Sequence, residues 1–138
     1  MKYIAYTRFP SNNPLYKTFL RPMIDLELKA IGKPIRLKAL LDTGADYNLA
    51  NKQYADLLGL SWNQGRSYST IGINGTPIQT YFHEIEYEII NLPKSNKKTW
   101  VGFVDSPGVG FLLGQTSFFN FFDFRFRRDK GSFSIEVI

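Results

Sequence analysis

The sequence has 138 residues, a formal net charge of +5 and an aromatic content of 16%, which fit one β-rich globular domain. It contains no cysteine and one histidine, which excludes disulfides and thiol nucleophiles, so we expect no metal and no cofactor. No stretch approaches the roughly 20 apolar residues of a membrane span, and residues 1–8 lack the apolar core of a signal peptide, so we expect a soluble, cytoplasmic protein with no membrane partner.

The N-terminal segment is predicted to be irregular. Residues 2–9 suit a short terminal strand, and the proline-containing stretch 10–14 breaks it. We therefore expect residues 1–21 to be a strand with a turn-rich extension, within one domain that spans residues 1–138.

Two strands follow in quick succession. Apolar and polar residues alternate from Met23 to Ala30, which is the pattern of a half-buried strand. A turn over 32–34 leads to a second alternating strand over 35–41. The two strands are predicted to form a hairpin that delivers Asp42 to its end.

A short helix and a longer hairpin are predicted next. The helix has one or two turns over 51–58, with Asn51 as its cap. Beyond it, Asn74-Gly75 separates two β-branched runs, which predicts a hairpin with a two-residue turn. The outgoing arm is expected to continue as one long strand to Ile90.

The second half of the chain is predicted as further short strands. An exposed connection over 91–98 leads to an apolar strand over 100–104. After an apolar stretch with a glycine at 111–115, the chain ends in two alternating strands, 122–127 and 132–138.

Basic residues cluster in two places, among the polar residues of 94–98 and on the strand 122–127. In the second cluster arginine alternates with phenylalanine, so the arginines are expected on the solvent face of a strand. No aromatic platform typical of RNA-binding domains is present, and we expect no nucleic-acid partner.

The most informative stretch is the end of the strand 35–41, where an apolar run leads directly into Asp42-Thr43-Gly44. Carboxylates at such points have buried surface behind them, which disfavours the charged form, and a second carboxylate nearby disfavours it further. Thr43 can hydrogen-bond to backbone or to a symmetry partner, and Gly44 permits the close approach of another chain.

The stretch 42–46, Asp-Thr-Gly-Ala-Asp, after a hydrophobic strand resembles the catalytic loop of the retropepsin-like aspartic proteases. A second landmark is the apolar-apolar-glycine at 112–114, which in that family leads into a short helix, here over 116–120, beneath the catalytic loop. The resemblance covers about residues 22–138 in element order. It implies an all-β fold, namely an acid-protease half-barrel with a flap hairpin and one or two short helices, assembled as a homodimer.

The implied activity is the hydrolysis of peptide bonds by a water molecule that two aspartates activate while they share one proton. Because the sequence holds one Asp-Thr-Gly, the resemblance implies that Asp42 of each subunit meets its own copy across a two-fold axis. A second catalytic aspartate is not expected at Asp105, because Pro107 stands where glycine is needed. The implied catalytic residues are Asp42, Thr43 and Gly44.

The implied substrate is a polypeptide, which is held as an added strand between the catalytic loop and the flap. The hairpin around residues 74 and 75 takes the place of the flap. The residues implied to bind the substrate are Ala45, Asp46, Ile71, Gly72, Ile73, Asn74 and Gly75.

Two further expectations concern contacts between subunits. Gln115 stands where the family commonly has a charged residue, so Arg8, from either subunit, is the alternative candidate for an ion pair with Asp46. In the family the chain termini of two subunits interleave into a shared sheet, which would cover the edges of the terminal strands.

Two other functions remain open on the sequence alone. A catalytically inactive member of the same fold would serve as a dimerisation or peptide-binding module, and binding of a transition-state inhibitor would separate it from an enzyme. A basic β-domain that binds nucleic acid would show a steep salt dependence of binding.

Overall fold

The structure is a computed structural model that describes residues 1–71 and 75–138. The strands, in chain order, are β1 (Lys2–Ala5), β2 (Thr7–Pro10), β3 (Thr18–Arg21), β4 (Met23–Lys29), β5 (Ile35–Leu41), β6 (Asn48–Asn51), β7 (Arg66–Ile71), β8 (Pro77–Ile89), β9 (Lys97–Val104), β10 (Phe111–Leu113), β11 (Phe122–Arg127) and β12 (Ser132–Val137). The helices are α1 (Lys52–Leu57) and three 3-10 turns, Trp62–Gln64, Phe119–Phe121 and Arg128–Lys130. No helix within the described ranges is long and apolar enough to cross a membrane.

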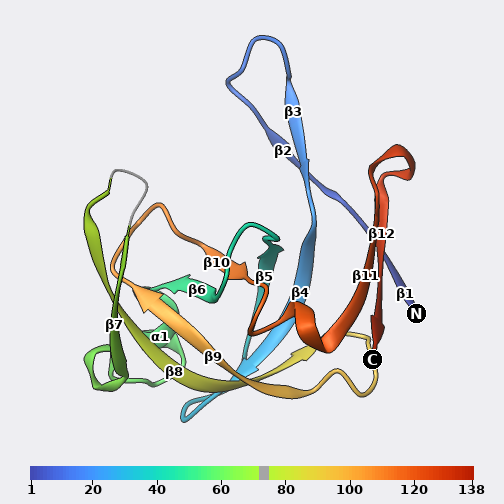
Figure 1. Ribbon diagram of the computed structural model, residues 1–138. Coiled ribbons are helices and arrows are strands. Elements are labelled where there is room, and N and C mark those ends of the chain that lie inside the picture. The colour runs from blue at the N-terminus through green and yellow to red at the C-terminus, as the bar shows by residue number, and fades with distance from the viewer. Residues whose placement is uncertain (72–74) are drawn as a thin grey trace.

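A closed barrel forms the centre of the molecule (Figure 1). Its strands follow the order β4-β5-β10-β6-β9-β8, and an antiparallel pairing of β4 with β8 closes the ring. β7 pairs with β8 outside the ring. Closure leaves these strands without free edges, which is how barrels avoid edge-to-edge aggregation. The all-β class is confirmed, and the expected half-barrel is found as a closed barrel.

The predicted hairpin before Asp42 is confirmed as β4 and β5, which pair in antiparallel register. Ile24, Leu26 and Leu28 are buried in the barrel, and the residues between them lie on the outer face. This follows from the two-residue period of a strand. Burial of each of these side chains contributes about 1.5–3 kcal/mol, so the hairpin is fixed to the core along its whole length.

The strand β10 lies between β5 and β6, although it comes some seventy residues later in the chain. Leu112 and Leu113 run parallel to Leu40 and Leu41 of β5. On its other side β10 is antiparallel to β6. The glycine landmark of the sequence therefore lies directly beside the end of β5, where the Asp42 loop begins.

The helix and the long hairpin predicted after this loop are also present. Asn51 caps α1, and its side chain accepts a hydrogen bond from the backbone N of Gln53 at 2.9 Å. β7 and β8 form the hairpin, in antiparallel register. Gly75 has a φ of +77°, the left-handed conformation that glycine favours in tight turns.

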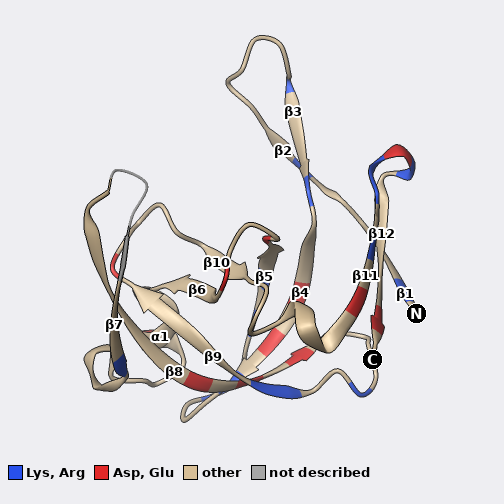
Figure 2. Ribbon diagram, viewed as in Figure 1, with Lys and Arg blue, Asp and Glu red and all other residues tan. Residues whose placement is uncertain are grey.

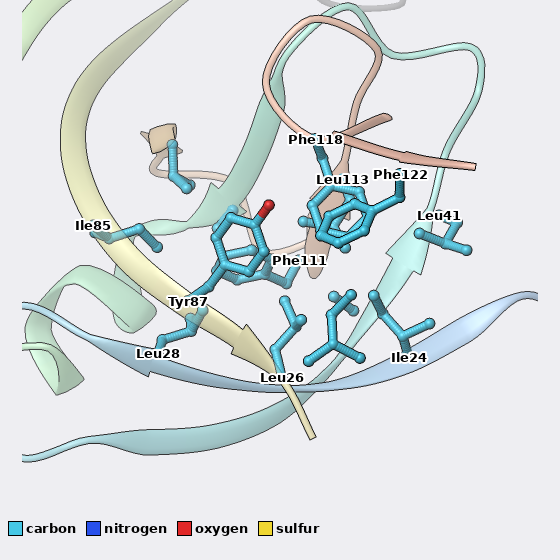
Figure 3. Packing of buried hydrophobic residues seen from close by; sticks show 14 of the residues in the cluster. Ile24, Leu26, Leu28, Leu41, Ile85, Tyr87, Phe111, Leu113, Phe118 and Phe122 are labelled. Atoms are coloured by element: carbon cyan, nitrogen blue, oxygen red, sulfur yellow. The ribbon is translucent and has the colours of Figure 1, made fainter. Parts of the chain in front are cut away.

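Aromatic rings join the barrel to a second, three-stranded sheet of β1, β12 and β11 (Figure 3). The ring of Phe118 lies 5.3 Å from that of Tyr87 and 5.0 Å from that of Phe122. Among the described residues, the hydroxyl of Tyr87 is the buried side-chain polar atom that lacks a hydrogen-bond partner. Burial raises the pKa of Tyr87 above its ordinary value of 10.0.

Two segments in the second half of the chain differ from the sequence-based expectation. Lys97 and Lys98 belong to β9 rather than to an exposed connection, because β8 is 13 residues long and offers each a partner. The Nζ atom of Lys98 lies 3.9 Å from the carboxylate of Glu86 on the neighbouring strand. The short helix expected over 116–120 is instead the 3-10 turn Phe119–Phe121.

The N-terminal segment forms three strands where one was expected. β1 pairs with β12, and β2 pairs with β3 as a separate two-stranded sheet. β12 lies between β1 and β11 of its own chain. Both edges of the last strand are therefore covered within the subunit. A sheet that the termini of two subunits share stays a prediction.

Candidate functional site

The Asp42 loop begins where β5 leaves the barrel. The backbone N of Asp42 donates to the carbonyl of Leu113 in β10 at 2.9 Å. One carboxylate oxygen, Oδ1, accepts a hydrogen bond from the backbone N of Gly44 at 3.0 Å. The side chain is half-buried, and Thr43 and Gly44 are exposed. The loop thus fixes the carboxylate at the edge of the barrel while it leaves the following two residues open to another chain.

Gly114 lies directly beneath this loop. A Cβ at this position would lie 2.5 Å from the carbonyl oxygen of Tyr47 and 2.8 Å from that of Ala45. Such distances are shorter than any ordinary contact, so only glycine lets β10 cross this close to the backbone of the loop. The apolar-apolar-glycine pattern is thereby explained as a packing requirement of the Asp42 loop.

Gln115 supports the loop in place of a charged residue. Its side-chain Nε2 donates to the carbonyl of Thr43 at 2.9 Å, and its backbone N donates to the carbonyl of Ala45 at 2.8 Å. Arg8, the alternative ion-pair candidate for Asp46, donates within its own subunit to Thr18 Oγ1 at 2.7 Å. An ion pair between Arg8 and Asp46 of another subunit stays a prediction.

Asn48 is the residue of the site that sequence reasoning missed. Its side chain is fully buried at the start of β6, where its Oδ1 accepts from Gly114 N at 2.9 Å. Its Nδ2 lies 3.3 Å from the carbonyl oxygens of both Trp100 and Ser117. This amide therefore ties the end of the Asp42 loop to β9 and to the segment after β10. The signal in the sequence is slight, because one asparagine near an exposed loop is unremarkable.

An aromatic hollow of about 370 Å³ opens beside the same loop. The rings of Tyr47 and Tyr68 lie edge-on to Phe82, at 5.8 Å and 6.4 Å, and the guanidinium of Arg66 lies 5.3 Å from the ring centre of Trp100. The lining residues are Tyr47, Arg66, Ser67, Tyr68, Phe82 and Trp100. Because Tyr47 follows Asp46 directly, the hollow continues from the Asp42 loop to the base of the β7–β8 hairpin.

A second hollow, of about 330 Å³, is unrelated to this site. Lys29 and Ile31 line it, and they lie at the end of β4 opposite to the end that pairs with Leu40. The described residues contain no group of three or more histidine, cysteine, aspartate or glutamate side chains that could hold a metal ion.

The sequence-predicted residues are placed as follows. Residues 42–46 form the connection between β5 and β6, in which Ala45 is half-buried and Asp46 is exposed. Ile71 ends β7, and Gly75 precedes β8. Gly72, Ile73 and Asn74 lie outside the described residues. The structure thus brings 42–46 together with 111–115, and it sets the base of the β7–β8 hairpin beside them.

No protein-family model matches the sequence, and no curated protein matches it. Among solved structures, the chain is similar to a retropepsin-like aspartic protease from Rickettsia conorii, with a TM-score of 0.65, 19% identity and 99% of each chain covered. It also matches EIAV protease complexed with the inhibitor HBY-793, with a TM-score of 0.47 and 26% identity over 68% of this chain and 81% of that one. The Rickettsia similarity shows that the protein has the retropepsin-like fold.

Proposed function

From the retropepsin-like fold and the Asp42 loop that it carries, we propose that the protein is an aspartic endopeptidase that acts as a homodimer. The observation that carries this proposal is the position of Asp-Thr-Gly, held at the edge of the barrel by hydrogen bonds from Asp42 N to β10 and from Gly44 N to the carboxylate. Each chain supplies one such loop, and a two-fold axis beside it brings two Asp42 side chains together.

The reaction proceeds through the pair of carboxyl groups, which hold one proton between them because two carboxylates in contact do not both ionise readily. The ionised Asp42 accepts a proton from water as the water oxygen attacks the peptide carbonyl carbon. The protonated Asp42 of the other subunit donates its proton to the carbonyl oxygen. As the C–N bond of the tetrahedral intermediate breaks, the leaving nitrogen takes the proton that the first Asp42 gained from water, and one hydroxyl of the intermediate gives its proton to the other Asp42, which restores the shared-proton pair.

The substrate is an extended polypeptide that lies between the Asp42 loop and the β7–β8 hairpin. Ala45 and Asp46 contact it from the loop, and Ile71, Gly72, Ile73, Asn74 and Gly75 contact it from the hairpin. The aromatic hollow beside Tyr47 accepts a large apolar side chain of the substrate, because four of its six lining residues are aromatic. Thr43 contacts its own copy, and Gly44 lines the substrate backbone.

The direct test is Asp42→Asn, assayed on a set of unstructured polypeptides. The variant keeps the shape of the carboxylate and removes its ability to exchange a proton, so cleavage should fall by about a thousand-fold or more. Asp56→Asn is the matched control, because Asp56 is an exposed aspartate in α1, outside the Asp42 loop and the aromatic hollow. It should cleave like the wild type.

Cleavage that persists in Asp42→Asn refutes the proposal that the protein is an aspartic endopeptidase. A wild-type protein that binds a transition-state inhibitor of aspartic proteases but cleaves no substrate is the inactive peptide-binding module instead.

A further inference from the structure

The hairpin of β2 and β3, residues 7–21, has little support from its own subunit. None of its residues is buried, and none of its side chains belongs to the hydrophobic core or packs against it. An isolated two-stranded sheet is at best marginally stable in water. A hairpin that projects from the barrel, as in Figure 1, therefore needs a second surface.

The attachment of this hairpin to the rest of the chain is confined to its base. Arg128 Nη1 donates to the carbonyl of Leu20 at 3.3 Å, and the guanidinium lies 5.5 Å from the ring centre of Tyr6. The tip nevertheless has a defined shape, because Asn13 Oδ1 accepts a hydrogen bond from the backbone N of Leu15 at 2.9 Å. The tip is thus built to present particular side chains.

Several of the side chains that the hairpin presents are large and apolar. Leu15 is 82% exposed, Tyr16 61% and Phe19 39%. Phe9 lies opposite Phe19 across the two strands, so the aromatic surface continues from one strand to the other. Contiguous exposed apolar side chains commonly mark an interaction site, whereas apolar residues exposed singly are ordinary.

The direction of the hairpin indicates what it contacts. In Figure 1 it rises past the barrel on the side to which the connection between β5 and β6 also projects. A two-fold axis beside the Asp42 loops puts the second copy on this side, so each hairpin extends along the other subunit.

The charges at this end of the molecule are complementary. Residues 7–21 contain Arg8, Lys17 and Arg21 and no acidic residue. The connections at the same end carry acidic residues, which Figure 2 shows after β5 and after β9, where the sequence has Asp42, Asp46 and Asp105. These opposite charges favour the encounter of two subunits, and they favour the orientation in which the hairpin of one subunit reaches the acidic end of the other.

The area that a stable dimer interface must bury also favours a second copy of the chain as the partner of the hairpin. A stable interface buries about 800 Å² on each side, more than two short loops supply. Both edges of β12 are already paired within the subunit, so this strand has no edge to share with another chain. Besides the aromatic side chains of the hollow, the exposed apolar side chains of the hairpin supply further surface for an interface at the Asp42 end.

We propose that the β2–β3 hairpin is an arm that packs against a second copy of this chain and holds the two Asp42 loops together. This inference rests on the proposed function, which needs the second copy. The arm makes dimer formation, and with it the completion of the site, depend on residues outside the Asp42 loop.

The test compares two double variants of the full chain by sedimentation equilibrium. Leu15→Gln with Tyr16→Gln removes the apolar tip of the arm. Ile31→Gln with Leu57→Gln is the control, because these side chains are matched in exposure, at 80% and 61%, and lie outside the arm. The arm variant should weaken dimerisation by at least about ten-fold, and the control should match the wild type.

Several results overturn the arm. One is an arm variant that dimerises as tightly as the wild type, and another is a control that weakens the dimer equally. A wild-type protein that is monomeric at all concentrations also refutes it and assigns the hairpin to a different partner. Circular dichroism at equal concentration checks that both variants keep the native fold.

The test of the arm can be distinguished from the test of the proposed protease activity. A weakened arm variant of a wild type that cleaves nothing supports the arm and refutes the protease. Unchanged dimerisation of the arm variant, alongside cleavage that Asp42→Asn abolishes, refutes the arm and leaves the protease.

Discussion

The Asp42 loop and the β2–β3 hairpin project at the same end of the molecule and are supported in opposite ways. The loop rests on a fully buried amide, Asn48, and on backbone contacts with β10. The hairpin contains no buried residue and is attached at its base by Arg128. A single subunit can therefore hold the Asp42 carboxylate in place, whereas the segment that we propose as the dimer arm is one that the subunit itself leaves unsupported.

The largest expected effect on stability comes from removing the buried amide. Asn48→Ala leaves the backbone N of Gly114 without its acceptor and removes the donors to Trp100 and Ser117, so we expect a loss of about 3 kcal/mol. Asn13→Ala, the matched change in the hairpin, removes one exposed acceptor from Leu15 and should cost less than about 1 kcal/mol. Urea unfolding of both variants measures the contrast, and equal losses would contradict it.

A smaller loss of stability is expected from a change at Gly114, where the Asp42 loop and the end of β10 are in contact. In Gly114→Ala the new methyl group meets the backbone of Tyr47 and Ala45, which must move, at a cost of about 2 kcal/mol. Gly110→Ala is the control, because nothing lies within 4 Å of a Cβ there. Thermal unfolding at fixed protein concentration compares them. A Gly114→Ala protein as stable as its control would show that the close crossing is not required.

The aromatic hollow and the arm are expected to affect different kinetic quantities. Tyr47→Ser enlarges and polarises the hollow, so KM for substrates with a large apolar residue should rise by about ten-fold while kcat changes little. Tyr16→Ser leaves the hollow intact and should instead make specific activity depend more steeply on enzyme concentration. Initial rates over a range of substrate and enzyme concentrations separate the two. A rise in KM from Tyr16→Ser would contradict the assignment of the hollow to substrate binding and of the arm to dimer formation.

The smallest effect concerns the unpaired hydroxyl in the core. Tyr87→Phe deletes a buried group that has no hydrogen-bond partner, so the variant should be more stable by about 1 kcal/mol. Burial raises the pKa of Tyr87, so above pH 10.0 the unfolded chain loses this proton before the folded one does. Wild-type stability should therefore fall above that pH more steeply than that of Tyr87→Phe. Parallel alkaline profiles would show that Tyr87 is not responsible.

The elements nearest to the core were the ones that the sequence predicted well. The alternation from Met23 to Leu41 predicts β4 and β5 because each buries one face. The cap at Asn51 is a local hydrogen bond, visible in the order of residues along the chain. β3 was missed because its residues face no core, so burial imposes no alternation on them.

The candidate site was predicted only as far as its chemistry is local. Asp42, Thr43 and Gly44 are consecutive in the sequence, so their pattern can be recognised without knowledge of the fold. The support from Asn48 was not predicted, because its partners Gly114 and Ser117 lie 66 and 69 residues away and only the insertion of β10 beside β5 brings them close. The aromatic hollow has the same origin, since its walls come from four separate segments.

The shared Asp42 pair is the central claim, and mixtures of wild type with Asp42→Asn test it most directly. The two proteins are equilibrated at constant total concentration, well above the dimer dissociation constant, and cleavage is measured against the wild-type fraction. If the site needs one Asp42 from each subunit, activity falls as the square of that fraction, to about one quarter in an equal mixture. Activity that falls in direct proportion to the wild-type fraction would mean that each chain cleaves alone, and would contradict the shared site.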